Sequence, residues 1–413
     1  MTFIVQSHCR LCASSNLDDF FDLGQQALSG CFPGPGQPDA PSAPLVLCRC
    51  QNCQLVQLRH SVDPTEMFTS DYGYRSSLNA AMQEHLQELH GWITKRFAVE
   101  PGDLVIDIGA NDGTLLATWQ NAGVNRLAID PILAKFSHQF PDDIEQIAGF
   151  FTHEMVLRKL AGRKARIITS ISMFYDLPDV SDFVAGIASA LSDDGIWVLE
   201  QSYLPTMLAN NSFDTICHEH LEYYALAQIE RVAEQHGLVV VDVQTNACNG
   251  GSFRLALGKE TGVGPRNTLA IAAMRQAEQQ LALDTPAPYA AFTARIANLR
   301  EQTRALLFDL KSQGKTVWLY GASTKGNVLL QHYGLDTDLI TGAVEVNSEK
   351  FGHRTPGTNI PIRAEAGILS ENPDYFFVLP WHFRDNILAR GQPYLEAGVK
   401  FIFPLPTLEI IEG

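Results

Sequence analysis

A glycine turn that directly follows a short apolar run constrains this chain more than any other feature of its sequence. Residues 104–113 have the sequence LVIDIGANDG, and the apolar first half predicts a buried strand. Gly109 and Gly113 allow the backbone to turn tightly and to approach a ligand. A helix is expected to begin near Thr114, with its amide dipoles directed at the occupant of the loop. The stretch therefore predicts an α/β domain with a ligand-binding loop.

The residues of this turn distinguish two kinds of nucleotide loop. A dinucleotide loop has the pattern G-x-G-x-x-G, but here Asn111 replaces the middle glycine and Asp107 precedes the first one. An acid before such a turn resembles motif I of the class I S-adenosylmethionine (SAM) methyltransferases. The resemblance implies that Asp107, Gly109, Asn111 and Gly113 contact SAM. A purely structural α/β turn is the alternative.

Composition limits the possible partners and compartment. The chain has 413 residues, which favours two or three domains, and a net charge of −16 argues against a nucleic-acid partner. No early apolar stretch approaches the length of a signal or membrane helix. We therefore expect a cytoplasmic protein without membrane contact, in which the eight cysteines stay reduced.

Two C-x-x-C pairs stand out near the N-terminus, at residues 9–12 and 50–53, with a Pro- and Gly-rich segment, 33–44, between them. Each pair presents two thiolates from one turn, so together they predict one structural zinc ion. Cys48 is an alternative ligand, Cys31 is a spare thiol, and four unrelated reduced cysteines are the alternative interpretation. The predicted ligands are Cys9, Cys12, Cys50 and Cys53.

From residue 103 onward, alternating strand and helix patterns predict a doubly wound α/β sheet. An antiparallel pair is expected to complete it, a finish that distinguishes a methyltransferase sheet from an ordinary dinucleotide sheet. The further strands are expected at 126–130, 146–151, 165–170 and 195–200, a helix at 179–191, and the final pair at 238–243 and 251–257.

Three side chains near the ends of these strands are further cofactor candidates. Asp130 ends the second strand, where an acid is suited to binding ribose hydroxyls. Phe150 lies at the turn that ends the third predicted strand, Ser170 ends the fourth, and we expect both to line the cofactor site.

A second strand, glycine turn and helix appear in the C-terminal third, at residues 316–326, after a helical stretch over 266–313. Ser323 and Lys325 lie where the helix would start, and helix-terminal amides with a lysine suit a phosphate or diphosphate. A structural turn with a solvated lysine is the alternative. Further strands are expected near 342–346, 375–379 and 400–403, which predicts a smaller second α/β unit.

The segment CHEHLEYY at residues 217–224 follows the fifth predicted strand, at the end of the sheet where ligands bind. His218, Glu219 and His220 in a row favour proton transfer, because an imidazole titrates near neutrality and a carboxylate can orient it. Tyr224 and Tyr74 are candidate hydrogen-bond donors to developing negative charge. A metal site and a hydrophilic loop are the alternatives for the segment, and an ordinary packing aromatic is the alternative for Tyr74.

The order of the motifs resembles that of the SAM-dependent sugar C-methyltransferases of deoxysugar biosynthesis, which act on nucleotide-linked ketosugars. The similarity extends over nearly the whole chain. It rests on the two C-x-x-C pairs, Y-x-S-S at 74–77, D-I-G-A-N-D-G at 107–113, H-E-H at 218–220, N-G-G-S at 249–252 and G-A-S-T-K-G at 321–326.

This resemblance implies a zinc-binding domain (1–65), a SAM-methyltransferase domain (66–265) and a C-terminal α/β domain (266–413) that helps to bind a dTDP- or GDP-linked ketosugar. It also implies that His220 is the general base and that Glu219 assists it. A base is what the reaction needs, because a keto group acidifies the adjacent C–H and the resulting enolate attacks the methyl group of SAM. No catalytic metal is needed, and we expect a monomer.

Two departures from the family pattern concern the sugar. Some members have tyrosine in place of Cys217, and some have histidine in the segment after the fourth strand, where Tyr175 is the candidate replacement. We also assign Asn249, in the N-G-G-S motif, to the substrate side. Which nucleotide and ketosugar are used, and whether C3 or C5 is methylated, therefore stay open.

Two other functions are compatible with parts of the sequence. One is a zinc-ribbon RNA or protein methyltransferase, against which the acidic composition argues. The other is a non-catalytic nucleotide-binding scaffold, against which the H-E-H segment argues.

Overall fold

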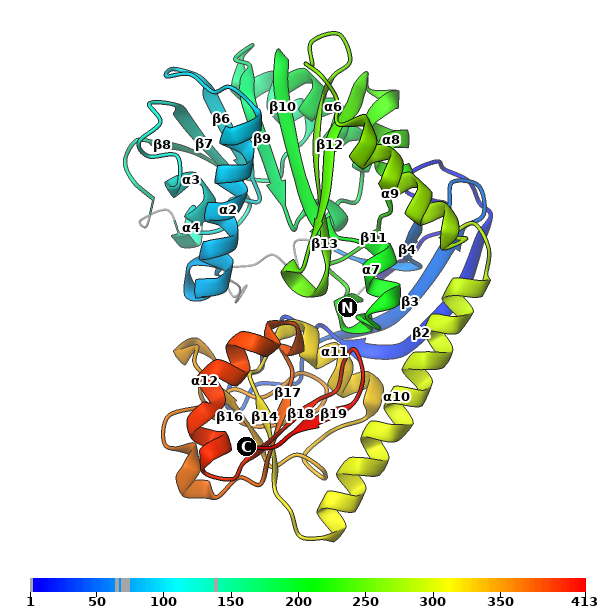
Figure 1. The fold of residues 1–413 in the computed structure, drawn as a ribbon, viewed down its shortest axis with the longest axis vertical. Coiled ribbons are helices and arrows are strands. Elements are labelled where there is room, and N and C mark those ends of the chain that lie inside the picture. Colours follow the sequence, from blue (N-terminus) through cyan, green and yellow to red (C-terminus); the bar gives the residue numbers. More distant parts are fainter. Residues whose placement is uncertain (1–2, 64–66, 68–74, 137–139) are drawn as a thin grey trace.

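The structure, a computed structural model, describes residues 3–63, 67, 75–136 and 140–413. Figure 1 shows a middle unit above a C-terminal unit, with an N-terminal sheet beside the junction of the two. The long helix α10 (Ala287–Ser312) leads along the same side to the C-terminal unit. Within the part of the chain that the structure describes, no helix has the length and apolar character needed to cross a membrane.

The middle unit is built on a seven-stranded sheet. All five residues of β6 (Leu104–Ile108) are buried, which explains the apolar run before the glycine turn. Strand β13 runs antiparallel to both of its neighbours, so the predicted doubly wound sheet and its antiparallel finish are confirmed. Across the sheet the order is β12 (Leu238–Asn246), β13 (Ser252–Lys259), β10 (Leu191–Ser202), β9 (Ala165–Ile171), β6, β7 (Asn125–Asp130) and β8 (Ile144–Ala148).

Helices cover both faces of this sheet. On one face, α2 (Ala80–Arg96) buries Leu86, Leu89 and Ile93, the apolar series expected from helical spacing. Its N-terminus is capped by Asn79, whose side chain accepts the N–H of Ala81 at 3.0 Å. The same face carries α3 (Thr114–Ala117), and the other face carries α6 (Val180–Ala190), α8 (Leu226–Gln235) and α9 (Thr268–Gln280).

The C-terminal unit has a six-stranded sheet. The sequence predicted four of its strands, and the short edge strands β16 and β19 were not predicted. The first strand lies in the middle, and parallel strands extend from it in both directions, as in doubly wound folds. Its elements are β14 (Val317–Tyr320), α11 (Thr324–Tyr333), β15 (Gly342–Glu345), β16 (Ile362–Ala364), β17 (Tyr375–Val378), α12 (Arg384–Glu396), β18 (Lys400–Phe403) and β19 (Glu409–Ile411).

The N-terminal sheet combines distant parts of the chain. Its strands, in order, are β11 (Glu222–Tyr223), β4 (Val56–Leu58), β3 (Ser42–Cys50) and β2 (Leu17–Ala27). A separate two-stranded ribbon pairs β1 (Phe3–Val5) with β5 (His60–Val62). β11 comes from the H-E-H region of the middle unit, so this sheet reaches the candidate site.

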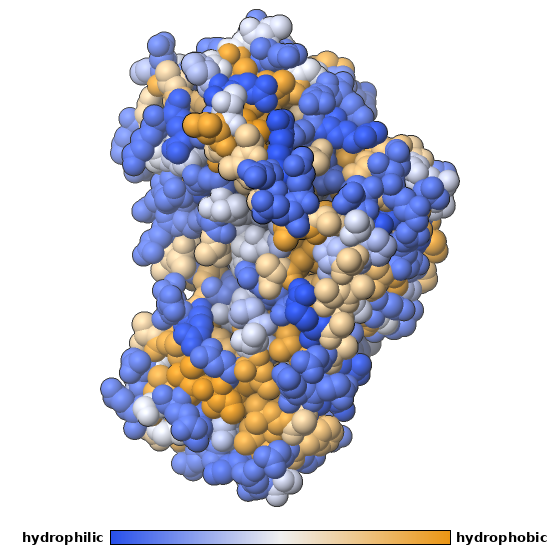
Figure 2. Space-filling view, turned by 45° about the vertical axis from the view of Figure 1, so that its right-hand side comes forward, coloured by the Kyte–Doolittle hydropathy of each residue, from blue (hydrophilic) through white to orange (hydrophobic). Residues whose placement is uncertain are grey.

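The N-terminal sheet also contacts the C-terminal unit. From α11, Gln331 exchanges two hydrogen bonds with the backbone of Ala27, at 2.6 and 3.2 Å. Asn327 donates to the carbonyl oxygen of Ser29 at 2.7 Å. Figure 2 shows an indentation between the middle and C-terminal units, with hydrophobic side chains gathered on the C-terminal unit below it. The three units therefore form one packed body.

Candidate active site

The glycine loop after β6 has a backbone that its residue types permit. Gly109 and Gly113 have φ angles of 74° and 78°, in the left-handed region. A Cβ atom at Gly113 would lie 2.6 Å from the ring of Phe140, and one at Gly109 would lie 2.9 Å from the side chain of Met173. Asn111 has φ 51°, which asparagine tolerates better than most residues. Both glycines are therefore required by backbone conformation and by packing.

Two buried carboxyl groups lie beside this loop. Asp107 accepts a hydrogen bond from the hydroxyl of Thr169 at 2.6 Å, and burial raises the pKa of Asp107 to about 7. Asp130 accepts the N–H of Asn111 at 2.9 Å and that of Ile132 at 2.8 Å, while burial raises its pKa. Asp130 thus fastens the loop to the neighbouring strand β7. Its contact with a ribose stays a prediction.

The segment before α2 lies over the same loop. The N–H of Ser76 donates to the side chain of Asn111 at 3.2 Å, and the N–H of Ser77 donates to Asp112 at 3.0 Å. These bonds bring the end of the Y-x-S-S motif to the glycine turn. Tyr74, the candidate active-site tyrosine, lies outside the described residues.

Phe150 and Ser170 occupy different surroundings. Phe150 is 47% exposed just after β8, so its ring is open to contact with a ligand. Ser170 is fully buried and accepts a hydrogen bond from the indole N–H of Trp197 at 2.8 Å. The hydroxyl of Ser170 is therefore engaged inside the sheet, and the cofactor contacts expected for both residues stay predictions.

His220 is held in a defined tautomer. Its Nδ1 atom lies 2.7 Å from the carbonyl oxygen of Thr215, which can only accept, so Nδ1 carries the hydrogen and Nε2 keeps its lone pair. The ring packs against Tyr175 with 4.1 Å between ring centroids. Burial, aided by the positive charge of Lys325, lowers the pKa of His220 to about 3. The imidazole is therefore neutral near pH 7, as a base must be.

His218 and Glu219 point to different surroundings. Nε2 of His218 lies 3.2 Å from the carbonyl oxygen of Ala43, in the N-terminal sheet, and burial lowers its pKa. Glu219 is 7% exposed, and its Oε2 has no hydrogen-bond partner among the described residues. Within the same residues, no hydrogen bond joins Glu219 to His220. Thr215, which the sequence did not single out, orients that imidazole.

Tyr224 lies deep in the middle unit. It is fully buried, and its ring is 5.3 Å from that of Phe174. Its hydroxyl has no hydrogen-bond partner within the described part of the chain, and burial raises its pKa well above the usual range. This environment is that of a core aromatic, and its role as a donor to the substrate stays a prediction.

The second glycine turn brings Lys325 to the middle unit. Lys325 Nζ donates to the carbonyl oxygen of Asn249 at 3.1 Å, in the turn between β12 and β13. Asn249 has φ 54°, and its side-chain amide lies 3.4 Å from the hydroxyl of Ser172. Ser323 accepts the N–H of Gly326 at 3.0 Å and caps α11. The predicted substrate-side residues of the two units therefore meet.

Three residues that the sequence did not single out adjoin this meeting point. The indole N–H of Trp381 donates to the buried carboxylate of Asp214 at 2.8 Å. A Cβ atom on Gly250 would lie 3.4 Å from the Trp381 ring, so this ring faces the same β12–β13 turn. Burial and the charge of Lys325 lower the pKa of His382 to about 3. Trp381 and His382 follow β17, and their place at the end of a predicted strand is the signal that could have identified them.

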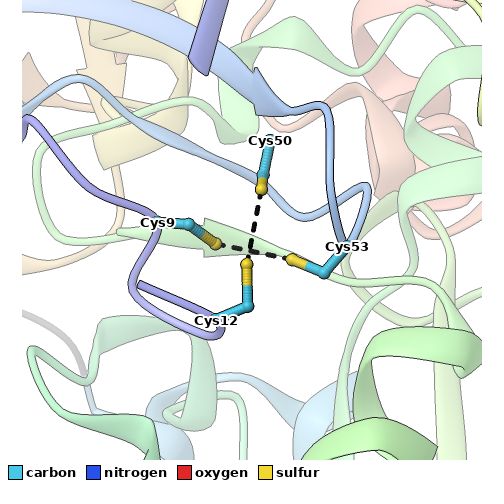
Figure 3. A group of neighbouring side chains, drawn as sticks. All are labelled: Cys9, Cys12, Cys50 and Cys53. Atoms are coloured by element: carbon cyan, nitrogen blue, oxygen red, sulfur yellow. Dashed lines mark hydrogen bonds between the residues drawn. The ribbon is translucent and has the colours of Figure 1, made fainter. Parts of the chain in front are cut away.

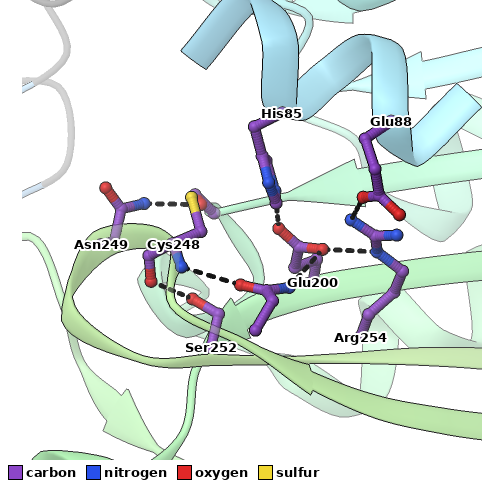
Figure 4. A network of polar contacts seen from close by, with 9 residues as sticks. His85, Glu88, Glu200, Cys248, Asn249, Ser252 and Arg254 are labelled. Carbon is purple, nitrogen blue, oxygen red and sulfur yellow. Dashed lines mark hydrogen bonds and ion pairs between the residues drawn. The ribbon is translucent and has the colours of Figure 1, made fainter. Parts of the chain in front are cut away.

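A polar network fixes the base of the β12–β13 turn (Figure 4). Glu200 accepts from Arg254 at 2.6 Å and from Asn246 at 3.1 Å, and it pairs with His85 on α2. Burial lowers the pKa of His85, but hydrogen bonds with Cys248 and Glu200 outweigh it and raise the pKa to about 10. His85, Glu200 and Cys248 lie close enough together to hold a metal ion. The protonated imidazole and the guanidinium already balance the carboxylate, so the network is an ion-pair cluster.

The four predicted zinc ligands converge on one point (Figure 3). Sγ of Cys9 lies 3.4 Å from that of Cys53, and Sγ of Cys12 lies 3.6 Å from that of Cys50. Zinc–sulfur bonds of about 2.3 Å in a tetrahedron require sulfur atoms roughly 3.8 Å apart, so the four thiols fit zinc. Cys48 lies outside the group, and burial raises the pKa of its thiol to about 12. Four thiolates fill a structural site and leave no position for substrate.

Three family models match successive parts of the chain. A zinc-binding domain model matches residues 9–68, a methyltransferase domain model matches 80–243, and a C-methyltransferase C-terminal domain model matches 247–406. Together they cover the three units in the order in which they occur along the chain.

A curated relative extends the similarity over the full length. C-methyltransferase NovU from Streptomyces niveus is 32% identical over 98% of this chain and 97% of its own. Among solved structures, magnesium protoporphyrin IX methyltransferase from Synechocystis PCC 6803 is 14% identical over 46% of this chain and 91% of that chain, with a TM-score of 0.36. The family assignment rests on the sequence matches. The chain belongs to the C-methyltransferase family and is a SAM-dependent methyltransferase with a zinc-binding N-terminal domain.

Proposed function

We propose that the protein transfers a methyl group from SAM to a carbon of a nucleotide-linked ketosugar, with His220 as the general base. The observation that carries the proposal is the tautomer of His220. Its Nδ1–H is committed to Thr215, so the lone pair on Nε2 is available to remove a proton. Lys325 and His220 lie near enough for the lysine charge to depress the histidine pKa, so proton acceptor and candidate diphosphate ligand share one site.

The proposed reaction has two steps, removal of a proton by His220 and transfer of the methyl group from SAM. The keto group of the sugar acidifies the neighbouring C–H, and Nε2 of His220 takes this proton, leaving an enolate. SAM supplies an electrophilic methyl group on its sulfonium. The new C–CH₃ bond forms as the S–CH₃ bond breaks, S-adenosylhomocysteine leaves, and His220 returns its proton to water.

Substrate binding strengthens the base in this arrangement. The charge of Lys325 is one of the two causes that hold the pKa of His220 near 3. A diphosphate bound to Lys325 compensates that charge, so the pKa of His220 rises when the substrate arrives. The imidazole is thus a weak base in the free enzyme and a stronger one in the complex.

We infer that Glu219 binds the sugar. Its buried Oε2 has no partner among the described residues, and an unpaired buried carboxylate oxygen is costly. We assign this oxygen to a sugar hydroxyl, which would donate to it. Glu219 then assists the base by fixing the sugar, while Thr215 fixes the imidazole.

The C-terminal unit has the features of a nucleotide site. Its strand order changes direction between β14 and β17, and ligands of doubly wound sheets bind at such a point. Glu345 ends β15 and accepts the N–H of Ala322 at 2.9 Å and that of Val346 at 2.7 Å. Asp130 makes the same kind of contacts in the middle unit. We therefore place a dTDP or GDP group here, with its diphosphate at Lys325.

A screen of dTDP- and GDP-linked ketosugars with SAM tests the proposal. One of them should gain the mass of one methyl group, and NMR of the product should place that group on a carbon next to the keto carbon. The matched control is His220→Asn, which keeps the hydrogen bond to Thr215 within reach but cannot act as a base. Methylation of oxygen or nitrogen, or of RNA or protein instead, would contradict the proposal.

A further inference from the structure

The loop that carries His220 is built onto the N-terminal sheet. β11, directly after the H-E-H segment, pairs antiparallel with β4. The N–H of Leu58 extends this pairing by donating to the carbonyl oxygen of Leu221 at 2.9 Å. β4 in turn follows the second C-x-x-C pair almost directly. The candidate base is therefore one residue away from a backbone contact with the zinc-binding unit.

Side chains reinforce this backbone contact on both sides of β11. Before the strand, the imidazole of His218 lies 3.2 Å from the carbonyl oxygen of Ala43. After it, the amide of Gln228 donates to the carbonyl oxygen of Cys53 at 2.9 Å. His218 therefore anchors the H-E-H segment to the N-terminal sheet, and Gln228 binds the backbone of Cys53, one of the predicted zinc ligands.

A buried contact between an arginine and a glutamate side chain completes the connection. Arg10 lies within the first C-x-x-C pair, and its Nε lies 3.5 Å from Oε1 of Glu222 in β11. The two side chains are 3% and 0% exposed. Arg10 also donates to the carbonyl oxygen of Leu58 at 2.7 Å, and its backbone N–H donates to Gln57 at 2.8 Å. One arginine thus links the zinc-binding turn, β4 and the strand that follows His220.

The middle unit holds the opposite edge of the same loop. The N–H of Leu221 donates to the carbonyl oxygen of Tyr175 at 2.7 Å, and the N–H of Leu204 donates to that of Tyr224 at 2.9 Å. We propose that the N-terminal unit positions the general base, and that Arg10 and Glu222 are positioning residues acting through the His220 loop. This inference rests on the proposed function, because it takes His220 as the base.

The physical reason is the sensitivity of proton transfer to placement. Nε2 of His220 must meet the sugar C–H while the methyl donor lies over the middle sheet, and a displacement of about 1 Å can cost about 100-fold in rate. A four-thiolate zinc site stiffens the turn that carries Arg10. The zinc-binding unit then contributes to kcat through the placement of His220.

Two disruptive variants, one conservative variant and a matched control test this role in the full-length, zinc-loaded protein. Glu222→Gln replaces the carboxyl group by an amide at nearly constant shape, and Arg10→Met removes the guanidinium. The control is Arg49→Met, because Arg49 is also buried in the N-terminal sheet but donates to Gln54 and Leu283 instead of β11. Arg10→Lys keeps the charge and serves as the conservative variant.

Three kinds of measurement distinguish a positioning role from a general loss of stability. In Glu222→Gln and Arg10→Met, kcat should fall about 10- to 100-fold, while the Kd for SAM and the KM for the ketosugar stay within about twofold. Hydrogen–deuterium exchange of the peptide covering 217–224 should become faster, and that of 104–113 should not change. Arg49→Met should match the wild type, and Arg10→Lys should recover part of kcat.

Failure of the positioning role can be distinguished from failure of the proposed function. If both variants keep the kcat of the wild type, or if exchange of 217–224 is unchanged, the positioning role is wrong. If the wild type methylates no ketosugar, the proposed function fails, and the exchange measurement alone still decides whether Arg10 and Glu222 hold the loop. Equal losses in Arg49→Met would mean that the N-terminal unit is only a stability element, which also overturns the inference.

Discussion

The Nδ1 atom of His220 lies 2.7 Å from the carbonyl oxygen of Thr215. A backbone carbonyl oxygen can only accept a hydrogen bond, so Nδ1 must carry the hydrogen. This contact therefore fixes the tautomer of the imidazole and leaves Nε2 as the acceptor. A positive charge that lowers the pKa of His220 comes from Lys325, which lies in the C-terminal unit. The pKa of the proposed base therefore depends on the charge of the proposed diphosphate ligand.

Replacing Lys325 by alanine should weaken binding of the nucleotide sugar. A lost charge-assisted contact costs about 1.5–3 kcal/mol, so KM should rise about 10- to 100-fold, while SAM affinity stays unchanged. Steady-state kinetics measure KM for the nucleotide sugar, and calorimetry measures the affinity for SAM. Lys315→Ala is the control, since Lys315 pairs with Asp374 at the start of β14. A loss of SAM affinity in Lys325→Ala with a normal KM would assign the loop to another ligand.

Asp130→Ala should weaken SAM binding by about 1.5–3 kcal/mol, the range for hydrogen bonds to a charged group. The same carboxylate also fastens Asn111 to β7, so part of this loss will come from a looser glycine loop. Calorimetric titration with SAM measures it. Asp142→Ala is a suitable comparison, because Asp142 lies just before β8 and is exposed. Equal SAM affinity in Asp130→Ala and the wild type would remove Asp130 from the cofactor site.

Metal analysis of the purified protein should give about one zinc ion per chain. The double variant Cys50→Ser and Cys53→Ser should lose the metal, since two of four ligands are gone. Cys48→Ser should retain it, because the Cys48 thiol donates to the carbonyl oxygen of Gln57 at 3.5 Å instead. Full zinc retention in the double variant would show that the ion is bound elsewhere.

The contributions of His220 and His382 to stability should fall as the solution is acidified below pH 6.5. The pKa values of His220 and His382 are about 3 in the folded protein and near 6.5 when unfolded, so between these values the unfolded chain binds more protons. Each histidine then removes about 1 kcal/mol between pH 6.5 and 5.5. In denaturant unfolding, His382→Gln should show a pH dependence smaller by about that amount. An unchanged slope would mean that His382 titrates normally in the folded state.

Much of the fold was predictable because its signals are local. The apolar run of β6 and the glycines after it specify a buried strand and a turn within ten residues, and the same pattern marked β14. β2 was not predicted, because this strand carries polar residues on an exposed face, as in LDDFFDLGQQA. β11 has two residues and pairs across the chain with β4, so no local pattern could reveal it.

The candidate site was predictable where chemistry requires a residue type. His220, Lys325 and the four zinc-ligand cysteines were named from imidazole, ammonium and thiol chemistry. Thr215 was not, because its contribution is a backbone carbonyl that any residue could supply. Glu219 was expected to orient His220, and the structure instead shows its Oε2 without a partner among the described residues. Such details depend on how a loop is folded.

The most direct test of the central claim is exchange of the sugar's acidic proton. With S-adenosylhomocysteine in place of SAM, methyl transfer cannot occur, and the wild-type enzyme should exchange the proton next to the keto group with deuterium from water. His220→Asn should do so about 100- to 10,000-fold more slowly, the usual loss when a general base is removed, while its affinity for SAM is retained. Exchange and methylation at the wild-type rate in His220→Asn would show that His220 is not the base.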